Sequence, residues 1–507
     1  MIIGIHRLRA CNKAFEKSTF YMFSFEFCQS AKFHLSKFLN FSFGIFSSML
    51  LLYDLLMAKK DSNNASRMGS KEVKAITNIF SILAAFCTIF LCQIGVSFAQ
   101  TEITARITKG AVKYLEALEM AVIDFSPKEL EYAPRITQVV RDDLEYSLYF
   151  RLAEIDSFVL AILGNDLYNL DGWRELGVQY LLEGSIKIEE DKLKAEINLM
   201  DVLRKKVILT KRYKTAPKSY RALAHAITDD LVLNLTGQKG IFSTKIAYVS
   251  VNQGHKEIYV CDYDGHNPYP VTNDKTINVS PKWSPEGDKL VYTSYKKGNP
   301  DLWMTDLKNS RSTLVSSQVG LNSAPAWSPD GRYLALTLTR DKNAEIYLIT
   351  PEGKIVRRLT HGWGIDSSPA WSPNGKEIAF TSDRTGYPKI YIMDIEGANL
   401  RRLPYTGDFA DSPCWSPRGD KIAFAARENG KFDIYTVDII GENLTRLTYD
   451  GFNENPHWSP DGLHIVFSSD RSGRYQLYTM NWDGSNQKPI TSGETNYNPS
   501  WSPILEE

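Results

Sequence analysis

The sequence predicts a six-bladed β-propeller preceded by a small α/β domain, and three observations point to this fold class. The triplet Trp-Ser-Pro occurs six times, at successive steps of 44, 44, 44, 43 and 43 residues. A repeat of about 40–45 residues is typical of propeller blades. Two apolar strands recur at the same step, and tight-turn pairs such as Asp-Gly separate them. The six repeated tryptophans are Trp283, Trp327, Trp371, Trp415, Trp458 and Trp501.

Each repeat predicts a sheet of three or four short antiparallel strands joined by tight turns. We assign the Trp-Ser-Pro strand to the innermost position (strand A), followed by strand B, as in "KIAF", strand C, as in "DIYT", and an outer strand D, as in "LTRLT". One such sheet cannot bury both of its faces, whereas six sheets around an axis can. The tryptophans are therefore interpreted as structural residues that pack between blades, and Ser-Pro and Asp-Gly as turn formers.

The order of the strands predicts how the ring closes. The propeller region, residues 243–507, begins with a B strand, Lys245–Ser250, that no Trp-Ser-Pro triplet precedes. The sixth triplet lies at the other end of the chain and is followed by only four residues. We therefore expect Asn498–Ile504 to supply the missing inner strand of the first blade by pairing with Lys245–Ser250.

The region before the propeller, residues 116–238, has the pattern of a compact α/β domain of ordinary size. The run "LEMAVIDF" predicts a short strand, and Pro134 opens a helix with an apolar stripe. Strand-like runs follow at "VQYLLEGSIKI", "KLKAEINLMDV" and "KKVILTKRYKT". Pro217 begins a second amphipathic helix, which Gly237 ends.

The N-terminal part of the chain predicts export. Residues 68–99 have two lysines, an apolar run and the small-x-small site Ser97-Phe98-Ala99, which is the layout of a signal peptide cleaved before Gln100. An uncleaved membrane anchor is the alternative, because the apolar run is nearly long enough to span a bilayer. We interpret residues 1–67 as an upstream extension from a misassigned start, with Met68 as the initiator. Residues 100–115 are expected to form a flexible partner-binding segment.

Composition and motifs argue against several function classes. The chain has 59 basic and 59 acidic residues, so no overall charge favours nucleic acid as a partner. There is no Gly-x-Ser-x-Gly elbow, HExxH motif, Walker loop or dinucleotide fingerprint, and we expect no catalytic residue, cofactor, metal or small-molecule substrate. Cys261 and Cys414 form no disulfide framework or zinc motif. His361 and His457 are interpreted as solvated loop residues.

A set of polar residues is predicted at one face of the ring, around the mouth of a central channel. Five residues before each repeat tryptophan stands Asn or Asp, and the fourth repeat departs because its Asp411 is shifted by one. These side chains either cap their own turns or present a binding surface. Cations of the B–C loops share this face, which suits a protein partner better than a small molecule. The residues are Asn278, Asn322, Asp366, Asp411, Asn453 and Asn496, with Lys296, Lys297, Arg384 and Arg471.

The chain resembles a known family over the region from Gln100 to the C-terminus. A signal peptide, a small α/β domain, the junction "LTGQKGIFSTKIAYVS" and six Trp-Ser-Pro blades together are similar to the TolB family, periplasmic components of the Tol-Pal system of Gram-negative bacteria. The resemblance implies a non-catalytic, monomeric protein within a larger complex. It would help to maintain outer-membrane integrity and outer-membrane constriction at cell division.

The resemblance also implies two partner-binding sites besides contacts with other Tol-Pal components. The peptidoglycan-associated lipoprotein Pal would dock at the channel mouth, and the inner-membrane protein TolA would bind the mature N-terminal segment. The implied Pal-binding residues are Asn278, Asn322, Asp366, Asp411, Asn453, Asn496, Arg384 and Arg471. The implied TolA-binding residues are Gln100, Thr101, Glu102, Ile103, Thr104, Ala105, Arg106 and Ile107.

A different function class stays open at this point. Propellers also serve as accessory domains of periplasmic hydrolases, or as lyases with a site centred on the channel. Such an enzyme would bring His, Glu and Arg side chains together near the channel, so the arrangement of these residues in the structure discriminates between the two classes.

Overall fold

A computed structural model describes residues 117–505, apart from 165, 405–406 and 429. The predicted upstream extension, the signal peptide and the N-terminal segment Gln100–Ile107 lie outside the described residues. Among the residues that the structure describes, no helix is long and apolar enough to cross a membrane.

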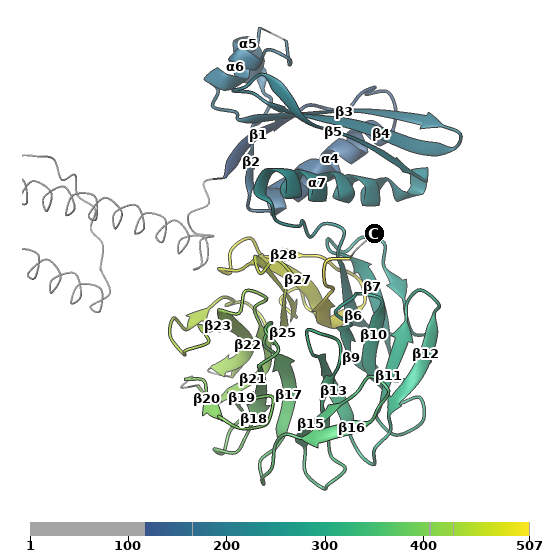
Figure 1. Cartoon of the computed structure of the whole chain (residues 1–507), viewed down its shortest axis with the longest axis vertical. Coiled ribbons are helices and arrows are strands. Elements are labelled where there is room, and N and C mark those ends of the chain that lie inside the picture. Colours follow the sequence, from purple (N-terminus) through teal and green to yellow (C-terminus); the bar gives the residue numbers. More distant parts are fainter. Residues whose placement is uncertain (1–116, 165, 405–406, 429, 506–507) are drawn as a thin grey trace, which may run out of the picture. The chain divides into compact units, whose positions relative to one another are not determined.

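The predicted α/β domain contains a five-stranded mixed sheet with the order β2-β1-β3-β4-β5 (Figure 1). Strand β1 pairs in parallel with β2 and β3, whereas β3, β4 and β5 form an antiparallel meander. Its elements are β1 (Leu118–Val122), α4 (Tyr132–Tyr146), β2 (Phe150–Leu152), α5 (Ser157–Ile162), α6 (Leu170–Glu175), β3 (Tyr180–Glu189), β4 (Lys192–Asp201), β5 (Lys206–Thr215), the 3-10 turn η2 (Pro217–Ser219) and α7 (Tyr220–Thr236).

Helices α4 and α7 cover one face of this sheet, and their apolar stripes form its main core. Ile136, Val140 and Leu144 of α4 are fully buried, as are Ile227 and Leu231 of α7. The opposite face carries a smaller core around Trp173 of α6, which packs with residues of β1 and β3. Sequence patterning predicted α4 and α7 but missed α5 and α6, because each is only six residues long.

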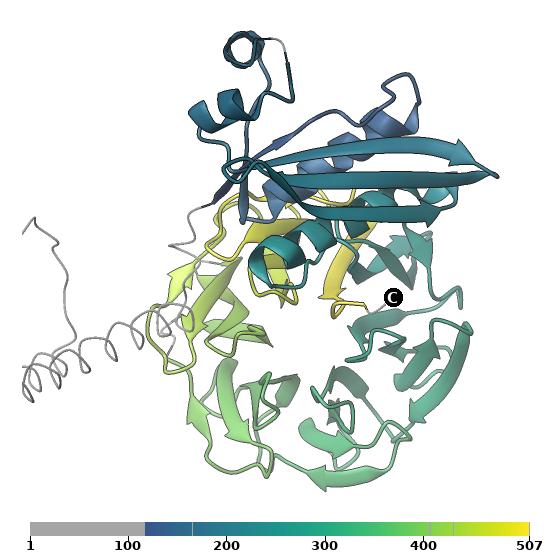
Figure 2. The same cartoon turned by 45° about the horizontal axis from the view of Figure 1, so that its top comes forward.

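Six four-stranded antiparallel sheets follow and form the ring in Figure 2, which confirms the predicted propeller. Given in the order A to D, the blades are β29, β6, β7, β8 (Thr495–Trp501, Lys245–Asn252, His255–Asp262, Tyr269–Pro270); β9–β12 (Asn278–Trp283, Lys289–Ser294, Asp301–Asp306, Arg311–Ser316); β13–β16 (Asn322–Trp327, Leu334–Leu338, Glu345–Ile349, Ile355–Arg358); β17–β20 (Asp366–Trp371, Glu377–Ser382, Lys389–Asp394, Arg401–Arg402); β21–β24 (Phe409–Trp415, Lys421–Glu428, Lys431–Asp438, Thr445–Arg446); and β25–β28 (Asn453–Trp458, His464–Ser469, Gln476–Asn481, Lys488–Pro489).

The A strands form the inner wall of the ring. Each A strand contacts the A strands of its two neighbouring blades, so the six strands make a closed circle. Each also contains a β-bulge, where one residue has a positive φ and a proline follows. Bulges bend and twist a strand, which suits an inner strand that must turn around an axis. The positive-φ residues are Ser280, Ala324, Ser368, Ser412, Asn455 and Asn498.

The first blade is closed by the C-terminal strand, as the repeat order predicted. Strand β29 pairs antiparallel with β6, from Thr495 opposite Val251 to Trp501 opposite Ile246. The pairing starts three residues earlier than the predicted Asn498, because the Asn-x-x-Pro segment before the tryptophan is already part of the strand. Beyond Trp501, the Ser502 N–H donates to the carbonyl of Lys245 at 2.8 Å.

The repeat tryptophans lie between neighbouring blades. The indole N–H of Trp283, Trp371 and Trp458 donates to the inner-strand carbonyl of the preceding blade, at 3.0, 3.1 and 3.2 Å. Trp501 instead donates to Thr244 Oγ1 at 2.8 Å, at the entry to the propeller. Within the described residues, the indole N–H groups of Trp327 and Trp415 have no hydrogen-bond partner.

Loss of the closing strand is expected to unfold the whole propeller. Removing Asn498–Glu507 should abolish cooperative folding, and Trp501→Ala alone should lower the free energy of unfolding by ~3–5 kcal/mol, because the side chain is buried. Chemical denaturation measures both effects. Trp363→Ala is the matched control, because Trp363 is 77% exposed and should change stability by less than about 0.5 kcal/mol. A mild, local effect of the truncation would contradict closure.

Candidate functional site

The D–A and B–C connections of all blades open on one face of the propeller, which we call the mouth face. Each A strand begins opposite the end of its B strand, as Asn278 pairs with Ser294 and Asp366 with Ser382. The chain enters strand A and leaves strand B at this same end. The A–B and C–D turns therefore lie at the opposite face.

The predicted Asn and Asp residues of the mouth face have buried side chains. Asn278, Asn322 and Asn453 are fully buried, and Asp366 and Asn496 nearly so. Asn453 shows what they contact: its Nδ2 donates to Asp433 Oδ1 of the preceding blade at 3.0 Å. In the structure, these residues therefore cap the D–A connections and tie them to neighbouring strands.

The contact of Asn453 belongs to a polar network that recurs around the ring. Thr448 of the same D–A connection donates to Asp433 at 2.8 Å and accepts the N–H of Ile434 at 2.9 Å. Corresponding sets are Asn278 with Glu257 and Thr272, and Asn496 with Gln476 and Thr491. Each set joins the inner strand of one blade to strand C of the blade before it.

Among its described residues, the connection into the β21–β24 blade lacks this network. Ala410, Lys389 and Pro404 stand at the positions of the Asn, the acid or amide, and the threonine. None of the three can reproduce the hydrogen bonds, and Lys389 instead donates to the carbonyl of Gly407. Asp411, the shifted residue, accepts a hydrogen bond from Thr381 at 2.7 Å and is partly exposed.

Arg384 and Arg471 stand at equivalent positions of two B–C loops. Each donates hydrogen bonds to one of the buried Asn and Asp residues described above. Arg384 Nη2 donates to Asp366 Oδ1 and Oδ2 at 2.9 and 2.8 Å. Arg471 Nη2 donates to Asn453 Oδ1 at 2.9 Å. Both guanidinium groups also lie over aromatic rings of strands B and C. Burial raises the pKa of Asp366, although Ser382 and Arg384 hydrogen-bond to the carboxylate.

The two lysines of the β10–β11 loop are also held on their own blade. Lys296 lies 3.7 Å from the ring centre of Trp303 and pairs with Asp274 at 3.5 Å. Lys297 lies over the same ring at 5.2 Å. The role of the predicted Asn, Asp and Arg residues in binding Pal stays a prediction, and the observed contacts make the mouth-face residues ones that position the loops.

Exposed apolar side chains of the mouth face were missed by the sequence reasoning. Val319 is 84% exposed and Trp363 is 77% exposed, both in D–A connections, and Tyr387 of a B–C loop is 62% exposed. Trp363 could have been found, because it falls outside the 43–44-residue step of the repeat tryptophans. Further exposed apolar residues in the described parts of these connections are Ile277, Ile365, Tyr449 and Phe452.

The interpretation of His457 as a loop residue was wrong. It lies in the inner strand β25, where its Nδ1 accepts the N–H of Trp501 at 3.2 Å. Burial, with Lys282 nearby, lowers the pKa of His457 to about 3. The sequence could not show this environment, because Trp501 belongs to the next inner strand and Lys282 to the inner strand of another blade. His361 is exposed between β16 and β17.

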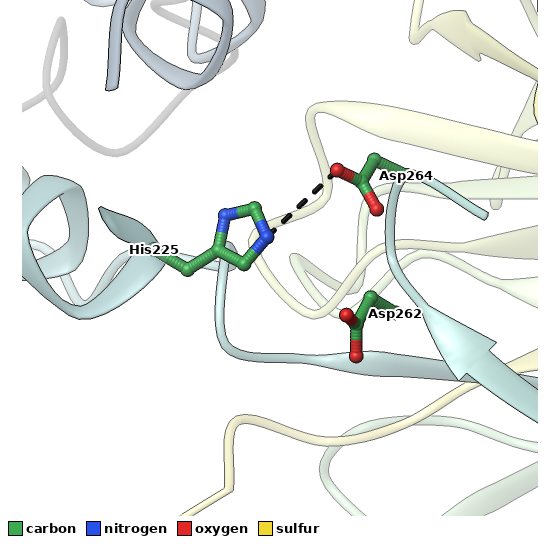
Figure 3. A group of neighbouring side chains, drawn as sticks. All are labelled: His225, Asp262 and Asp264. Atoms are coloured by element: carbon green, nitrogen blue, oxygen red, sulfur yellow. Dashed lines mark ion pairs between the residues drawn. The ribbon is translucent and has the colours of Figure 1, made fainter. Parts of the chain in front are cut away.

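A buried polar cluster joins the α/β domain to the first blade. His225 Nδ1 of α7 lies 2.8 Å from Asp143 Oδ2 of α4, and Tyr263 of the propeller donates to Asp143 Oδ1 at 2.6 Å. Arg221 of α7 pairs with Asp264, which follows Tyr263 in the β7–β8 turn. Figure 3 shows His225 directed toward Asp264, with 3.8 Å between Nε2 and Oδ2.

The same cluster contains three residues in a metal-like arrangement. Ligand atoms of His225, Asp262 and Asp264 lie within 4.8 Å of one another, and His225 Nε2 is buried without a hydrogen-bond partner in the described structure. Asp262, however, already accepts hydrogen bonds from Lys245 at 2.7 Å and Asn267 at 2.6 Å. A metal ion would compete with Lys245 and with the Arg221 guanidinium on Asp264. The contacts are those of an ion-pair network between two parts of the fold.

Charge on His225 is expected to stabilise the fold at low pH. Burial alone would lower its pKa, but the Asp143 and Asp264 carboxylates outweigh burial, and the pKa is raised above 6.5. A raised histidine pKa stabilises the folded state fully below the unfolded-state pKa, and this contribution disappears as the pH rises through the folded-state pKa. Burial raises the pKa of Asp143 as well, despite its bonds to His225 and Tyr263.

The variant His225→Gln tests this pH dependence, because glutamine keeps a donor for Asp143 but carries no charge. Its free energy of unfolding should fall by roughly 2 kcal/mol at pH 6, and the difference from the parent protein should shrink toward pH 9. Urea denaturation across this range measures the difference. His361→Gln, at an exposed site, is the control. A deficit that is equal at all pH values would contradict a role of the charge.

Comparison with known proteins identifies both parts of the fold. The family model described as the TolB beta propeller domain matches residues 232–505, and the model described as the TolB amino-terminal domain matches residues 104–208. A solved structure of TolB from Acinetobacter baumannii superimposes with a TM-score of 0.66 at 28% identity, and the match covers 76% of this chain and 97% of that chain.

Curated relatives match shorter stretches. The Tol-Pal system protein TolB of Desulfosudis oleivorans is 38% identical over 144 residues, which are 28% of this chain and 33% of that protein. The protein of the same name from Alkalilimnicola ehrlichii is 35% identical over 188 residues, 36% of this chain and 43% of the relative. These alignments thus span less than half of each relative. The propeller model alone covers more than half of the chain, and the chain belongs to the TolB family.

Proposed function

We propose that this chain is a non-catalytic periplasmic protein of a Tol-Pal system, which binds a Pal lipoprotein on its mouth face and TolA through its N-terminal segment. In this role it contributes to outer-membrane integrity and to outer-membrane constriction at division. Family membership supports the system, since the curated relatives carry the name Tol-Pal system protein TolB.

The observation that carries the proposal is the set of exposed apolar side chains on the mouth face. Trp363, Tyr387 and Val319 are all more than half exposed, although burial of such side chains is favourable. Exposed apolar residues gathered on one face are a sign of protein-interaction sites, and Trp and Tyr dominate the binding energy in many interfaces. The mouth face therefore offers anchors for a protein partner.

The buried networks beneath this face support the same proposal. Asn278, Asn453 and Asn496 tie D–A connections to the preceding blades, and Arg384 and Arg471 hold two B–C loops. Loops held in one conformation lose little conformational entropy when a partner binds. In this proposal, the polar residues named from the sequence act beneath the interface, and the apolar residues make the direct contacts.

The alternative function, an accessory propeller of a hydrolase or a lyase, has less support. It requires His, Glu and Arg side chains to meet near the axis. Among the described residues, His457 Nδ1 contacts the backbone of Trp501 and Trp458, and the charged group that acts on His457 is Lys282. Glu454 of the mouth face is influenced by Tyr475, Asp411 and Asp470, and not by His457.

Trp363→Ala is expected to weaken binding of a lipid-free Pal fragment by at least about tenfold, because a buried tryptophan anchor is worth ~2 kcal/mol or more. Calorimetry or surface plasmon resonance measures the dissociation constant. Ile440→Ala is the matched control, since Ile440 is 73% exposed but lies in a C–D turn at the opposite face. Equal losses in both variants, or no loss in Trp363→Ala, would contradict docking at the mouth face.

Deleting Gln100–Gly110 is expected to abolish binding of the periplasmic domain of TolA while the propeller stays folded. If the segment also responds to Pal, the deletion changes Pal affinity, because coupling between two sites requires a state that both partners bias. A pulldown of the exported protein with each partner reads both effects. Unchanged binding of TolA and of Pal would refute the proposed role of the segment.

A further inference from the structure

At one position of the repeat, immediately before each Trp-Ser-Pro tryptophan, three blades carry a lysine, a cysteine and a histidine. These residues lie on the inner strands of the propeller, yet several are partly exposed, so solvent reaches them along the axis of the ring. We call this space the axial channel. The six residues at this position are Lys282, Ala326, Ala370, Cys414, His457 and Ser500.

Lys282 is a charged residue in this channel without a countercharge. It is the penultimate residue of strand β9, directly before Trp283, and is partly exposed. Neither a hydrogen bond nor an ion pair to its ammonium group occurs within the described residues. Burial lowers its pKa, and the neighbouring group that acts on its charge is the Cys414 thiol rather than a carboxylate. Other lysines of the same blade have acidic partners, as Lys289 has Asp288 and Lys296 has Asp274.

The inner-strand carboxylates Asp411 and Glu454 lie nearer the mouth face than the repeat position of Lys282. Asp411 and Glu454 each stand three residues before Cys414 and His457, about 10 Å away along the strand, at the mouth face. Burial raises the pKa of Glu454, and Asp411 and Asp470 add to this effect. Lys282 is not among the groups that influence Glu454. These inner-strand carboxylates therefore lie toward the mouth face, and Lys282 lies deeper in the channel.

His457 is the second donor at the level of Lys282. The N–H of Trp501 can only donate, so its hydrogen bond makes Nδ1 an acceptor and leaves the ring proton on Nε2. The carbonyl of Trp458 lies 3.1 Å from the same Nδ1 and competes for it only in the other tautomer. With Nδ1 engaged, Nε2–H is the ring donor left for a ligand.

We propose that Lys282 and His457 bind an oxyanion, a carboxylate or a phosphate, inside the axial channel. Such a ligand would supply the countercharge and the hydrogen-bond acceptors that the inner strands do not provide, and charged groups in partly dehydrated sites are normally paired. The ligand is either a free anion or a carboxylate on a chain inserted into the channel, because both present the same oxygen atoms. This site is separate from the apolar anchors of the mouth face.

Cys414 offers a direct test, because it stands at the same repeat position as Lys282, on an inner strand across the channel, and its thiol acts on the charge of Lys282. Iodoacetate carries a carboxylate and iodoacetamide is its neutral counterpart, and both alkylate the thiolate. We expect the ratio of the two rate constants at Cys414, iodoacetate over iodoacetamide, to fall about tenfold in Lys282→Met. The ratio removes any change in thiolate content, and mass spectrometry of the Cys414 peptide in the full chain separates this thiol from the others.

Two further variants sharpen the test. Lys282→Arg keeps the positive charge and should retain the parent ratio, and Lys289→Met removes a cation that is already paired with Asp288 and should also retain it. Thermal unfolding checks that Lys282→Met stays folded. If the ratio in Lys282→Met equals that of the parent protein, or falls equally in Lys289→Met, the site does not exist.

Competition identifies the class of anion. Sodium phosphate and sodium acetate are each added at constant ionic strength, with chloride as the reference, and iodoacetamide alkylation of Cys414 is followed. Selective slowing by phosphate indicates a phosphate site, and selective slowing by acetate indicates a carboxylate site, in each case only if Lys282→Met abolishes the effect. Protection that is absent, or equal in both proteins, would overturn the proposal.

Discussion

The antiparallel pairing of β29 with β6 is the contact on which the rest of the structure depends. It joins segments more than 240 residues apart, as the bond between Lys245 N–H and Ser502 Oγ shows. The same hydrogen bond from a backbone N–H to a serine hydroxyl occurs in the A–B turns, where the chain is continuous. There the Ser284 and Ser328 hydroxyls accept the N–H of Lys289 and Tyr333. The closing contact therefore has the hydrogen bonds of an ordinary A–B turn but no connecting loop. The chain entropy lost when the two distant segments come together is offset by a full set of strand contacts.

The closing blade is also where the α/β domain packs. Trp501, Ile246 and Tyr248 belong to one buried cluster with the apolar residues of α4 and α7. The polar bonds from Asp143 to Tyr263 and from Arg221 to Asp264 lie beside this cluster. An opened ring would expose apolar surface of both parts, so closure and domain packing stabilise each other.

The repeat pattern was sufficient to predict the blades and their closure, because each is encoded by residues at a constant step. The step also located Asn278, Asn453 and their equivalents, but it could not show that these side chains point inward, since their partners lie in the preceding blade. Lys389, Pro404 and Ala410 are explained together, because all three replace members of one hydrogen-bond network. Short helices such as α5 and single exposed residues such as Trp363 have no repeat partner and were missed.

The polar and apolar residues of the mouth face divide the work of a binding surface. Buried hydrogen bonds in a region of low dielectric hold one loop conformation, because breaking any of them leaves an unpaired polar group. The exposed side chains of Val319, Trp363 and Tyr387 do not hold the loops in this way, so the residue type at these positions can be set by the binding partner. The connection into β21 has no Asn network, and its Asp411 is partly exposed. At this sector the face therefore presents a carboxylate, whereas the other sectors bury the corresponding Asn or Asp side chain.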